Sequence, residues 1–364
     1  MGDKKTPFYK KHQEHNAKMV SFAGYSMPIQ YAGIMDEHRT VRESVGVFDV
    51  SHMGEFIVKG ADAEQFINKM VTNDITSLKP GKAQYNAMCY PDGGLVDDLI
   101  VYKFEDYFMM VVNASNIEKD FKWLEKNMDK GDIGIINKSD TIGLLAVQGP
   151  NALATLQKLT EIDLSEIGFY NFVEGKLAGK KMTISRTGYT GEKGFELYHD
   201  PEDSDELWDK IFQAGQEYNI KPAGLGARDT LRMEMKYALY GNDIDKNTNP
   251  LEAGLGWITK LDKEDFIGKD ALTEIKDNGL SRKSIIFVLN ERGIPRKGYP
   301  IFKNGQEIGE VTSGTMSPIL NTGIGIGYVK TEYSKPGTTI EIKIRKKKVP
   351  AEIKKPPLVD SSPV

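Results

Sequence analysis

Hydrophobic and polar residues follow different patterns in the two parts of the chain. From about residue 48 to 280, strand-like alternation at Phe56 and Val58 occurs beside helical spacing at 66–70. A further strand is predicted at 144–148, where a Gly-Pro pair then ends it. Strands and helices mixed in this way predict an α+β region.

The remainder of the chain, from about residue 282, has the pattern of an all-β domain. Five short strands are predicted there, at 285–289, 299–302, 308–312, 324–329 and 339–344. Asn304-Gly305 is the strongest hairpin signal, because both residues tolerate the positive φ of a tight turn. The spacing predicts a small barrel or sandwich, with a boundary at 276–283. The proline-rich segment 356–364 is predicted to be a disordered tail.

Length and composition exclude several classes of protein. At about 100–200 residues per domain, 364 residues predict two or three domains. With 48 basic and 52 acidic residues the net charge is −4, which argues against a protein that wraps nucleic acid. The single cysteine, Cys89, excludes an intrachain disulfide and a thiolate metal site. No apolar run reaches the roughly 18 residues of a membrane span, and the N-terminus lacks a secretory signal, so we expect a cytoplasmic protein.

The most informative segment is a predicted hairpin at 85–102. Its turn is Pro-Asp-Gly-Gly at 91–94, which places Tyr85 opposite Ile100 and Tyr90 opposite Leu95. On this register Asp98 shares a face with Tyr85 and Tyr102, whereas Asp97 points the other way. Aspartate is depleted in strands, so two adjacent ones require an explanation. Either one faces solvent and the other caps a turn, or Asp98 lies at the floor of a cavity.

Two further polar residues interrupt apolar patterns. Glu196 lies in an alternating strand after a glycine-rich turn, and it faces either solvent or a ligand whose paired N–H groups a carboxylate can bind. Arg228 lies at the start of a predicted helix, where the macrodipole favours acidic residues instead. It therefore forms a salt bridge with a neighbouring domain or faces an oxygen-rich ligand.

Several other chemistries are not supported by motifs. There is no Gly-x-Ser-x-Gly nucleophile elbow and no phosphate-binding loop of the Gly-x4-Gly-Lys type. None of the five histidines lies in a His-Glu-x-x-His pattern, so no metal site is predicted. The Gly-x-Gly at 224–226 is a weak dinucleotide signal, because Asp229 occupies the third glycine position.

Six segments, in order along nearly the whole chain, resemble one family. They are Phe48–Glu55, Gly93–Leu99, Gln148–Pro150, Arg186–Glu192, Gly224–Asp229 and Gly268–Leu272. Together they resemble the aminomethyltransferases, or T-proteins, of the glycine cleavage system. The resemblance implies three domains around a central folate cavity: two antiparallel-sheet α+β domains, and a C-terminal barrel or jelly-roll-like domain. The implied boundaries are 1–50 with 140–245, 51–139 with 246–280, and 282–355.

The same resemblance implies a reaction and its residues. An aminomethyl group on the lipoyl arm of H-protein would pass its methylene to tetrahydrofolate, giving 5,10-methylenetetrahydrofolate, ammonia and dihydrolipoyl H-protein. Asp98 matches the catalytic aspartate, which we expect to be ionised beside the folate nitrogens. Glu196 and Arg228 match folate-binding residues. The other expected folate contacts are Tyr85, Tyr102, Tyr189, Tyr237, Met53 and Asn113.

Two alternatives share the expected fold. One is a folate-dependent demethylase, although such proteins are usually joined to a flavin dehydrogenase that this chain lacks. The other is a non-catalytic folate-binding relative, whose cysteine-containing motif is absent at 265–270. Family members often end in an aromatic segment that reaches folate. The segment after Lys355 has no aromatic residue, which leaves a C-terminal folate contact open.

Overall fold

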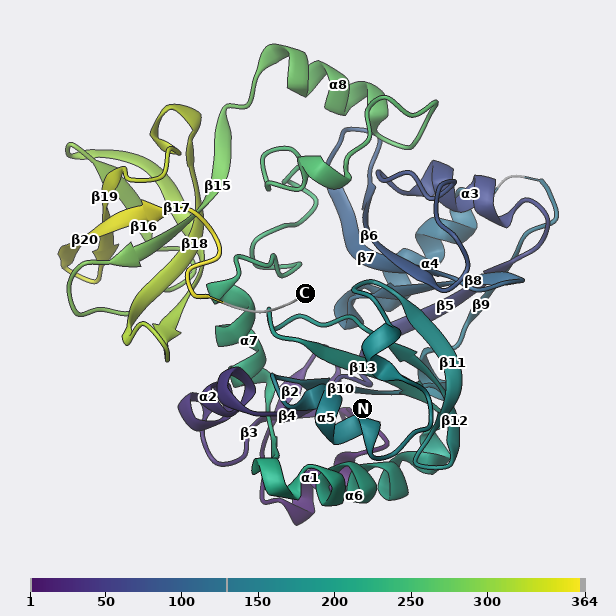
Figure 1. Ribbon diagram of the computed structural model, residues 1–364. Coiled ribbons are helices and arrows are strands. Elements are labelled where there is room, and N and C mark those ends of the chain that lie inside the picture. The colour runs from purple at the N-terminus through teal and green to yellow at the C-terminus, as the bar shows by residue number, and fades with distance from the viewer. Residues whose placement is uncertain (1, 129, 361–364) are drawn as a thin grey trace.

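The computed structural model describes residues 2–128 and 130–360, and these form three bodies around a central space (Figure 1). Two bodies are mixtures of sheet and helix, and the third is a closed β-barrel. The predicted α+β class with three domains is therefore confirmed. The residue boundaries proposed for the domains stay a prediction. No helix among the described residues is long and apolar enough to cross a membrane.

The first body is built on a six-stranded sheet with the order β11-β12-β13-β10-β4-β14. Its strands are β4 (Gly46–Asp49), β10 (Gly143–Gln148), β11 (Phe172–Leu177), β12 (Lys180–Ser185), β13 (Gly194–His199) and β14 (Lys221–Pro222). One face packs a core that includes Val147, Leu197 and Trp208 against α5 (Ala152–Gln157) and α6 (Ser204–Ala214). The other face turns toward the second body.

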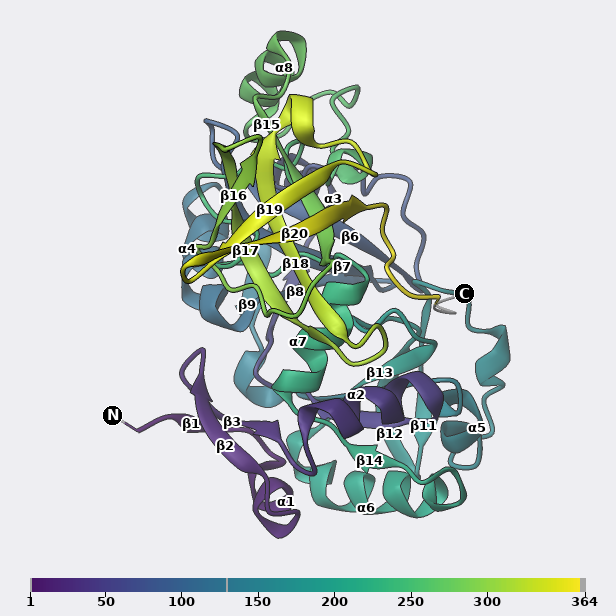
Figure 2. The ribbon, with the colours of Figure 1, turned by 90° about the vertical axis from the view of Figure 1, so that its left-hand side faces the viewer.

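Further elements of the first body come from the N-terminal residues and from the chain after β14. A three-stranded sheet joins β1 (Lys4–Lys5), β3 (Tyr25–Gln30) and β2 (Lys18–Phe22), and α1 (Tyr9–Glu14) precedes β2. The helices α2 (Ile34–Glu43) and α7 (Leu225–Glu234) pack together, and α7 also contacts β3 and the barrel. Figure 2 shows the barrel above α7 and α2. Helix α7 is thus held between two bodies.

The second body is a five-stranded antiparallel sheet with the order β6-β7-β8-β5-β9. Its strands are β5 (Gly54–Lys59), β6 (Lys82–Cys89), β7 (Leu95–Lys103), β8 (Tyr107–Val112) and β9 (Gly134–Asn137). Helices α3 (Ala63–Met70) and α4 (Ile117–Lys126) cover one face through an apolar core. The other face packs on the first body, where Tyr102 and Val111 meet Phe48 and Tyr198. This sheet-on-sheet contact brings β7 close to β13.

Helix α8 (Lys269–Asn278) packs against the turn of the β6–β7 hairpin, and the chain then continues into the barrel. Its Leu272 packs in one cluster with Leu95 and Cys89, and Cys89 is fully buried. Burial in this apolar cluster raises the pKa of the Cys89 thiol. The helix covers the first part of the predicted boundary 276–283.

The barrel closes in the order β15-β18-β17-β16-β19-β20. Its strands are β15 (Arg282–Leu289), β16 (Pro300–Lys303), β17 (Gln306–Ser317), β18 (Thr322–Lys330), β19 (Thr339–Ile344) and β20 (Lys347–Lys354). The five predicted strands are confirmed. Asn304 and Gly305 both have positive φ and join β16 to β17, as the hairpin signal predicts. The sixth strand, β20, was not predicted, because its basic start obscures the alternation of Val349, Ala351 and Ile353.

The prediction of a disordered tail is wrong for residues 356–360, because this segment packs on the rest of the protein. It runs from the barrel back toward α7 (Figure 1), and the Leu358 N–H donates to the Glu234 carbonyl at 2.8 Å. Leu358 packs on a small apolar cluster that joins Met233 of α7 to Ile286 of the barrel. This cluster could not be predicted from the sequence, because it forms only where α7, the barrel and the C-terminal segment pack together. Residues 361–364 lie outside the described part of the chain.

Candidate active site

A cavity of about 1120 Å³ lies where the three bodies meet. It exceeds the usual size of a small-molecule site, about 300–1,000 Å³, so there is room for a large ligand. Eight of the nine predicted site residues line it: Met53, Tyr85, Asp98, Asn113, Tyr189, Glu196, Arg228 and Tyr237. The residues selected by pattern, Asp98, Tyr85, Glu196 and Arg228, thus lie in one cavity with those expected only from the family resemblance.

Asp98 reaches the cavity because of the register of the β6–β7 hairpin. Tyr85 pairs with Ile100, as predicted, and Ala87 pairs with Asp98. The predicted pairing of Tyr90 with Leu95 is wrong, because the register shifts between Met88 and Cys89 and Leu95 pairs with Cys89. The shift lies on the turn side of Asp98, so it leaves Asp98 facing the cavity.

Asp98 is held by one hydrogen bond to each carboxyl oxygen. The Tyr85 hydroxyl donates to Oδ2 at 2.8 Å, and the Asn113 amide donates to Oδ1 at 2.9 Å. Burial, together with the neighbouring charge of Asp97, raises the pKa of Asp98 to about 7. A carboxyl with a pKa in this range can take up and release a proton near neutral pH, as a general acid or base must.

Glu196 projects from β13 toward the cavity, while its neighbours Phe195 and Leu197 enter the core of the first body. The Thr187 hydroxyl donates to Glu196 Oε2 at 2.5 Å. Burial raises the pKa of Glu196, with partial compensation from this hydrogen bond and from Arg228. The alternative of an exposed strand face is therefore wrong, because Glu196 is buried at the cavity wall, and its contact with a ligand stays a prediction.

Arg228 lies in the first turn of α7 and faces the cavity. Its guanidinium carbon is 4.8 Å from the centre of the Tyr189 ring. Among the described residues, Arg228 forms no salt bridge, whereas Arg232 one turn later pairs with Asp229 and Asp243. The salt bridge to a neighbouring domain, one of the two alternatives predicted for Arg228, is therefore absent among the described residues. Its side chain is available to an oxygen-rich ligand.

The glycines at the start of α7, Gly224 and Gly226, allow close packing. A Cβ at Gly224 would lie 2.5 Å from the Ile29 carbonyl of β3, and one at Gly226 would lie 2.6 Å from the Ile34 side chain. Only glycine lets the start of α7 approach β3 this closely. This close approach fixes the position of Arg228.

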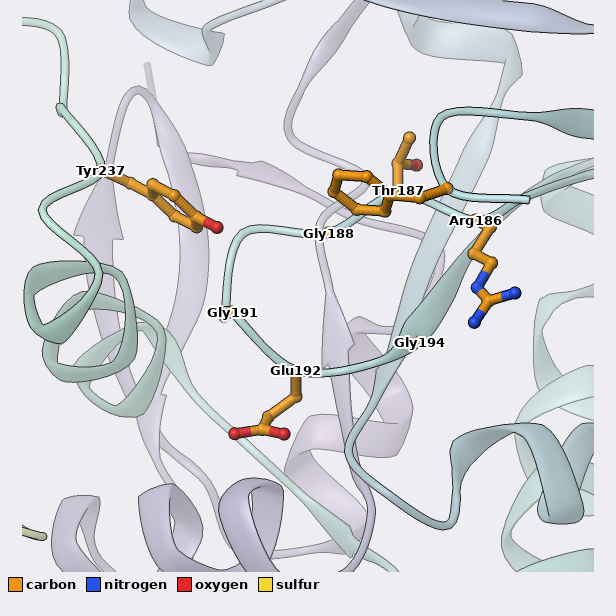
Figure 3. A pocket seen from close by; sticks show the side chains of 8 residues that line it. Arg186, Thr187, Gly188, Gly191, Glu192, Gly194 and Tyr237 are labelled. Atoms are coloured by element: carbon orange, nitrogen blue, oxygen red, sulfur yellow. The ribbon is translucent and has the colours of Figure 1, made fainter. Parts of the chain in front are cut away.

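Tyr189 and Tyr237 form an aromatic part of the wall. Their rings stack with centroids 5.7 Å apart, and the Tyr189 hydroxyl donates to the Ala238 carbonyl. Figure 3, a close view of a smaller pocket beside the glycine-rich turn, shows Tyr237 facing the loop that carries Gly188 and Gly191, while Arg186 points away from it. Arg186 instead donates to the Ile167 carbonyl at 2.7 Å.

Tyr102 is the one predicted site residue that does not line the cavity. It is fully buried, and its hydroxyl lies 2.9 Å from that of Tyr198 and 3.2 Å from Thr187 Oγ1. Four residues beyond Asp98, β7 has already entered the interface between the two sheets. The alternation of side chains along β7 correctly predicts the face on which Tyr102 lies. It does not predict how far along the strand the cavity extends. Through Thr187, Tyr102 supports Glu196 indirectly.

Two further residues that line the cavity were not among the predicted site residues. His52 is one of them, and its buried Nδ1 atom has no hydrogen-bond partner among the described residues. Burial and the charge of Arg228 lower the pKa of His52 to about 4, so its ring is neutral. Trp257 is 62% exposed at the cavity, with its ring 6.0 Å from that of Tyr85. Trp257 lies in the short 3-10 helix Gly256–Ile258, and an isolated tryptophan there gives no pattern that distinguishes it.

Comparisons with known proteins agree over the whole length of the chain. Residues 8–263 match the model of the GCVT N-terminal domain, and residues 282–360 match the glycine cleavage T-protein C-terminal barrel domain. An aminomethyltransferase of Halothermothrix orenii is 52% identical, with 98% of this chain and 100% of the relative covered. One from Bacteroides fragilis is 54% identical, with 97% and 99% covered. The crystal structure of glycine cleavage system aminomethyltransferase T from Bartonella henselae superposes with a TM-score of 0.91, at 34% identity and 98% coverage of both chains.

The stacked sheets, the barrel and the cavity between them define a class of three-domain proteins built around a central cavity, and the matched aminomethyltransferase T structure shares this fold. Within that class, the chain belongs to the glycine cleavage T-protein family. Its enzymatic activity is accordingly that of an aminomethyltransferase.

Proposed function

We propose that this enzyme transfers the methylene of an aminomethyl group, carried on the lipoyl arm of H-protein, to tetrahydrofolate. The products are 5,10-methylenetetrahydrofolate, ammonia and dihydrolipoyl H-protein. The carbon gains bonds to two folate nitrogens and loses its bonds to the amine nitrogen and to the lipoyl sulfur. The two protons released from the folate nitrogens end on ammonia and the thiol, so no oxidant or reductant is needed.

The observation that carries the proposal is the state of Asp98 in the cavity. Its pKa of about 7 matches a base that works near neutral pH, and its hydrogen bonds to Tyr85 and Asn113 fix both carboxyl oxygens. Asp98 takes a proton from the attacking nitrogen. Before it takes the proton, the ionised carboxylate also stabilises positive charge that develops on the transferred carbon.

The opposite part of the cavity supports recognition of the folate ring. Glu196 binds paired N–H groups of the pterin through its two carboxyl oxygens, with Thr187 holding one of them. Arg228 binds an oxygen of the ligand, and Tyr189 and Tyr237 supply flat apolar surface. The volume of about 1120 Å³ leaves room for a lipoyl arm beside the folate.

The test of this function is ammonia release from aminomethylated H-protein, measured with and without tetrahydrofolate. We expect release that depends on folate and yields methylenetetrahydrofolate in equal amount. Dimethylglycine and sarcosine, each with an added two-electron acceptor that oxidises the methyl carbon to the methylene level, serve as competing one-carbon donors, since a demethylase of the same fold would use them. Methylenetetrahydrofolate formed from either amine, with none formed from H-protein, would reject the proposal.

The first prediction concerns Asp98→Asn. The amide keeps the size of the side chain and can still accept from Tyr85, but it cannot take a proton. We expect kcat to fall by about 100-fold or more, with a much smaller change in the KM for tetrahydrofolate. Steady-state kinetics of ammonia release measure both values. Asp106→Asn, in the exposed β7–β8 turn, is the matched control, and an Asp98→Asn enzyme as fast as this control would exclude the role.

A further inference from the structure

A group of three aspartates, here the carboxyl cluster, connects Asp98 to the interior of the second body. It consists of Asp97 and Asp98 on β7 and Asp120 on α4. Asp97 points away from the cavity toward α4, and both Asp97 and Asp120 are fully buried. Buried carboxyls are costly unless they are paired, so this cluster requires a reason.

Asp97 has the surroundings of an ionised carboxylate. The Asn113 backbone N–H donates to its Oδ2 at 3.1 Å, and the Asn113 amide donates to its Oδ1 at 2.8 Å. The Asn116 amide donates to the same Oδ1 at 2.6 Å. All three contacts are N–H donors, which an ionised carboxylate accepts best.

The same contacts fix Asn113 against Asp98. The Asn113 Nδ2 atom is 2.9 Å from Asp98 Oδ1 and 3.1 Å from the Asp98 carbonyl oxygen. With Asp97 on the same amide, Nδ2 faces only acceptors, so the amide has one orientation. Asp97 therefore determines which group Asn113 presents to Asp98.

Asp120 has the surroundings of a protonated acid. Neither of its oxygens has a hydrogen-bond donor among the described residues, and Lys119 Nζ approaches no closer than 3.7 Å. Its carboxyl contacts that of Asp97, and two buried carboxyls in contact share one proton. Because Asp97 already accepts three N–H donors, the proton resides on Asp120, which donates it to Asp97. Burial and the charge of Asp97 raise the pKa of Asp120 well above its ordinary value.

We propose that Asp97, ionised and hydrogen-bonded by a protonated Asp120, is a positioning residue that sets the basicity of Asp98 and orients Asn113 toward it. This inference deepens the proposed function and rests on it, because the basicity of Asp98 affects turnover only if Asp98 takes the folate proton.

The remaining groups around the carboxyl cluster leave Asp97 as the dominant charge. The titratable and charged side chains that face Asp97 or Asp98 from other elements are Tyr85, Tyr90, Lys119, Tyr170, Tyr189 and Tyr240. The pKa of every one of these tyrosines is raised, mainly by burial, so all are neutral at working pH. Lys119 donates to the Val96 carbonyl and carries the one positive charge of this group. The negative charge nearest to Asp98 is that of Asp97.

The test compares Asp97→Asn with the wild-type enzyme in two measurements. Carbon-13 NMR of aspartate-labelled protein without substrate follows the titration of Asp98, assigned by its loss in Asp98→Asn. The pH profile of kcat/KM for ammonia release reports the same group during turnover. In Asp97→Asn we expect both midpoints to fall by about one unit or more, because a neighbouring negative charge is removed. Above pH 7 we expect kcat to fall by about tenfold, because a weaker base removes the proton less well.

Asp120 provides a second, independent arm. Asp120→Asn retains an N–H donor toward Asp97 and mimics the protonated acid, so the Asp98 midpoint should stay within about half a unit of wild type. Asp120→Leu removes that donor, and the Asp97 carboxylate should titrate at higher pH. In the wild-type protein, the Asp120 carboxyl signal should remain that of the protonated acid at pH 7. Asp106→Asn serves as the control for charge loss on the same sheet, with unchanged midpoints.

An Asp98 midpoint that Asp97→Asn leaves within the error of the Asp106→Asn control would overturn the inference. Asp120 found ionised at pH 7 in the wild-type protein would do the same, even if Asp97→Asn fails to fold. The NMR titrations need no substrate, so they read the carboxyl cluster independently of turnover. Absence of folate-dependent ammonia release in the wild type would reject the proposed function and leave the titration result standing.

Discussion

At the scale of single residues, the site combines two carboxyls with different roles. Asp98 has a pKa near neutral, whereas we expect Glu196 to bind the folate ring. Asp98 is half-buried and Glu196 is buried, and desolvation raises the pKa of each. The difference lies in their neighbours. Asp97 adds a negative charge beside Asp98, whereas Arg228 favours the ionised form of Glu196. Two carboxyls whose neighbours carry opposite charges can therefore have different roles in one cavity.

Glu196→Gln tests the binding role. The amide keeps its contact with Thr187 but offers one acceptor oxygen instead of two, and its NH₂ group opposes a ligand N–H. The loss of a charge-assisted hydrogen bond is worth about 1.5–3 kcal/mol, so the KM for tetrahydrofolate should rise by about 10- to 100-fold. We expect kcat at saturating folate to change less. Glu174→Gln, on the exposed face of β11, is the control, and equal KM values for the two variants would contradict the role.

At the scale of elements, the position of Arg228 depends on how closely α7 approaches β3. Gly224 has an ordinary negative φ of −95°, so an alanine there meets no backbone strain. The obstacle is the Ile29 backbone, 2.5 Å from the position of a Cβ. The glycine pair that resembled a weak phosphate loop is in fact a packing requirement.

We therefore predict that Gly224→Ala destabilises the protein by about 1–3 kcal/mol, the usual cost of overpacking. Urea unfolding followed by circular dichroism measures this change. Gly256→Ala is the matched control, because its Cβ would meet only ordinary contact at 3.8 Å and its φ is not positive. If the two variants unfold at the same urea concentration, the close approach of α7 and β3 does not contribute to stability.

The sequence predicts elements better than it predicts where they meet. The turn at 91–94 has a recognisable composition, which is why Tyr85 was correctly placed opposite Ile100. The register shift beside Cys89 has no such signature. Tyr102 was assigned to the cavity because alternation specifies a face, whereas the start of the sheet interface depends on the partner sheet. The same limit applies to Trp257, whose position beside Tyr85 is set by loop geometry.

At the scale of the whole molecule, polar contacts in the interface connect the barrel to α7 and to the loop that follows it. The Arg232 guanidinium donates to Ser313 at 2.9 Å, and Ser317 donates to Glu234 at 2.6 Å. Thr312 donates to Asp243 at 2.6 Å. Because α7 also carries Arg228, the barrel contributes to the geometry of the site through this helix as well as through Thr315 and Met316 of β17, which line the cavity.

The segment 356–360 adds an apolar contact to this connection, and Pro356 lines the cavity. A chain that ends at Lys355 loses both, so we predict a lower melting temperature and a KM for tetrahydrofolate raised several-fold. A chain that ends at Asp360 keeps the described contacts and is the control. Thermal unfolding and steady-state kinetics of the two truncated chains measure the effect. If both resemble the full chain, the segment is not part of the cavity wall in solution.

The burial of Cys89 has a practical consequence for experiments that measure movement of the three bodies. The chain has no other thiol, and this one is fully buried beneath α8 with a raised pKa. A thiol that is neither accessible nor ionised reacts poorly with maleimide and methanethiosulfonate reagents. Pairs of cysteines introduced on the barrel and on the second body can then carry spin labels or fluorophores without removal of the native residue. Distances between such labels would report whether the three bodies close when folate and H-protein bind.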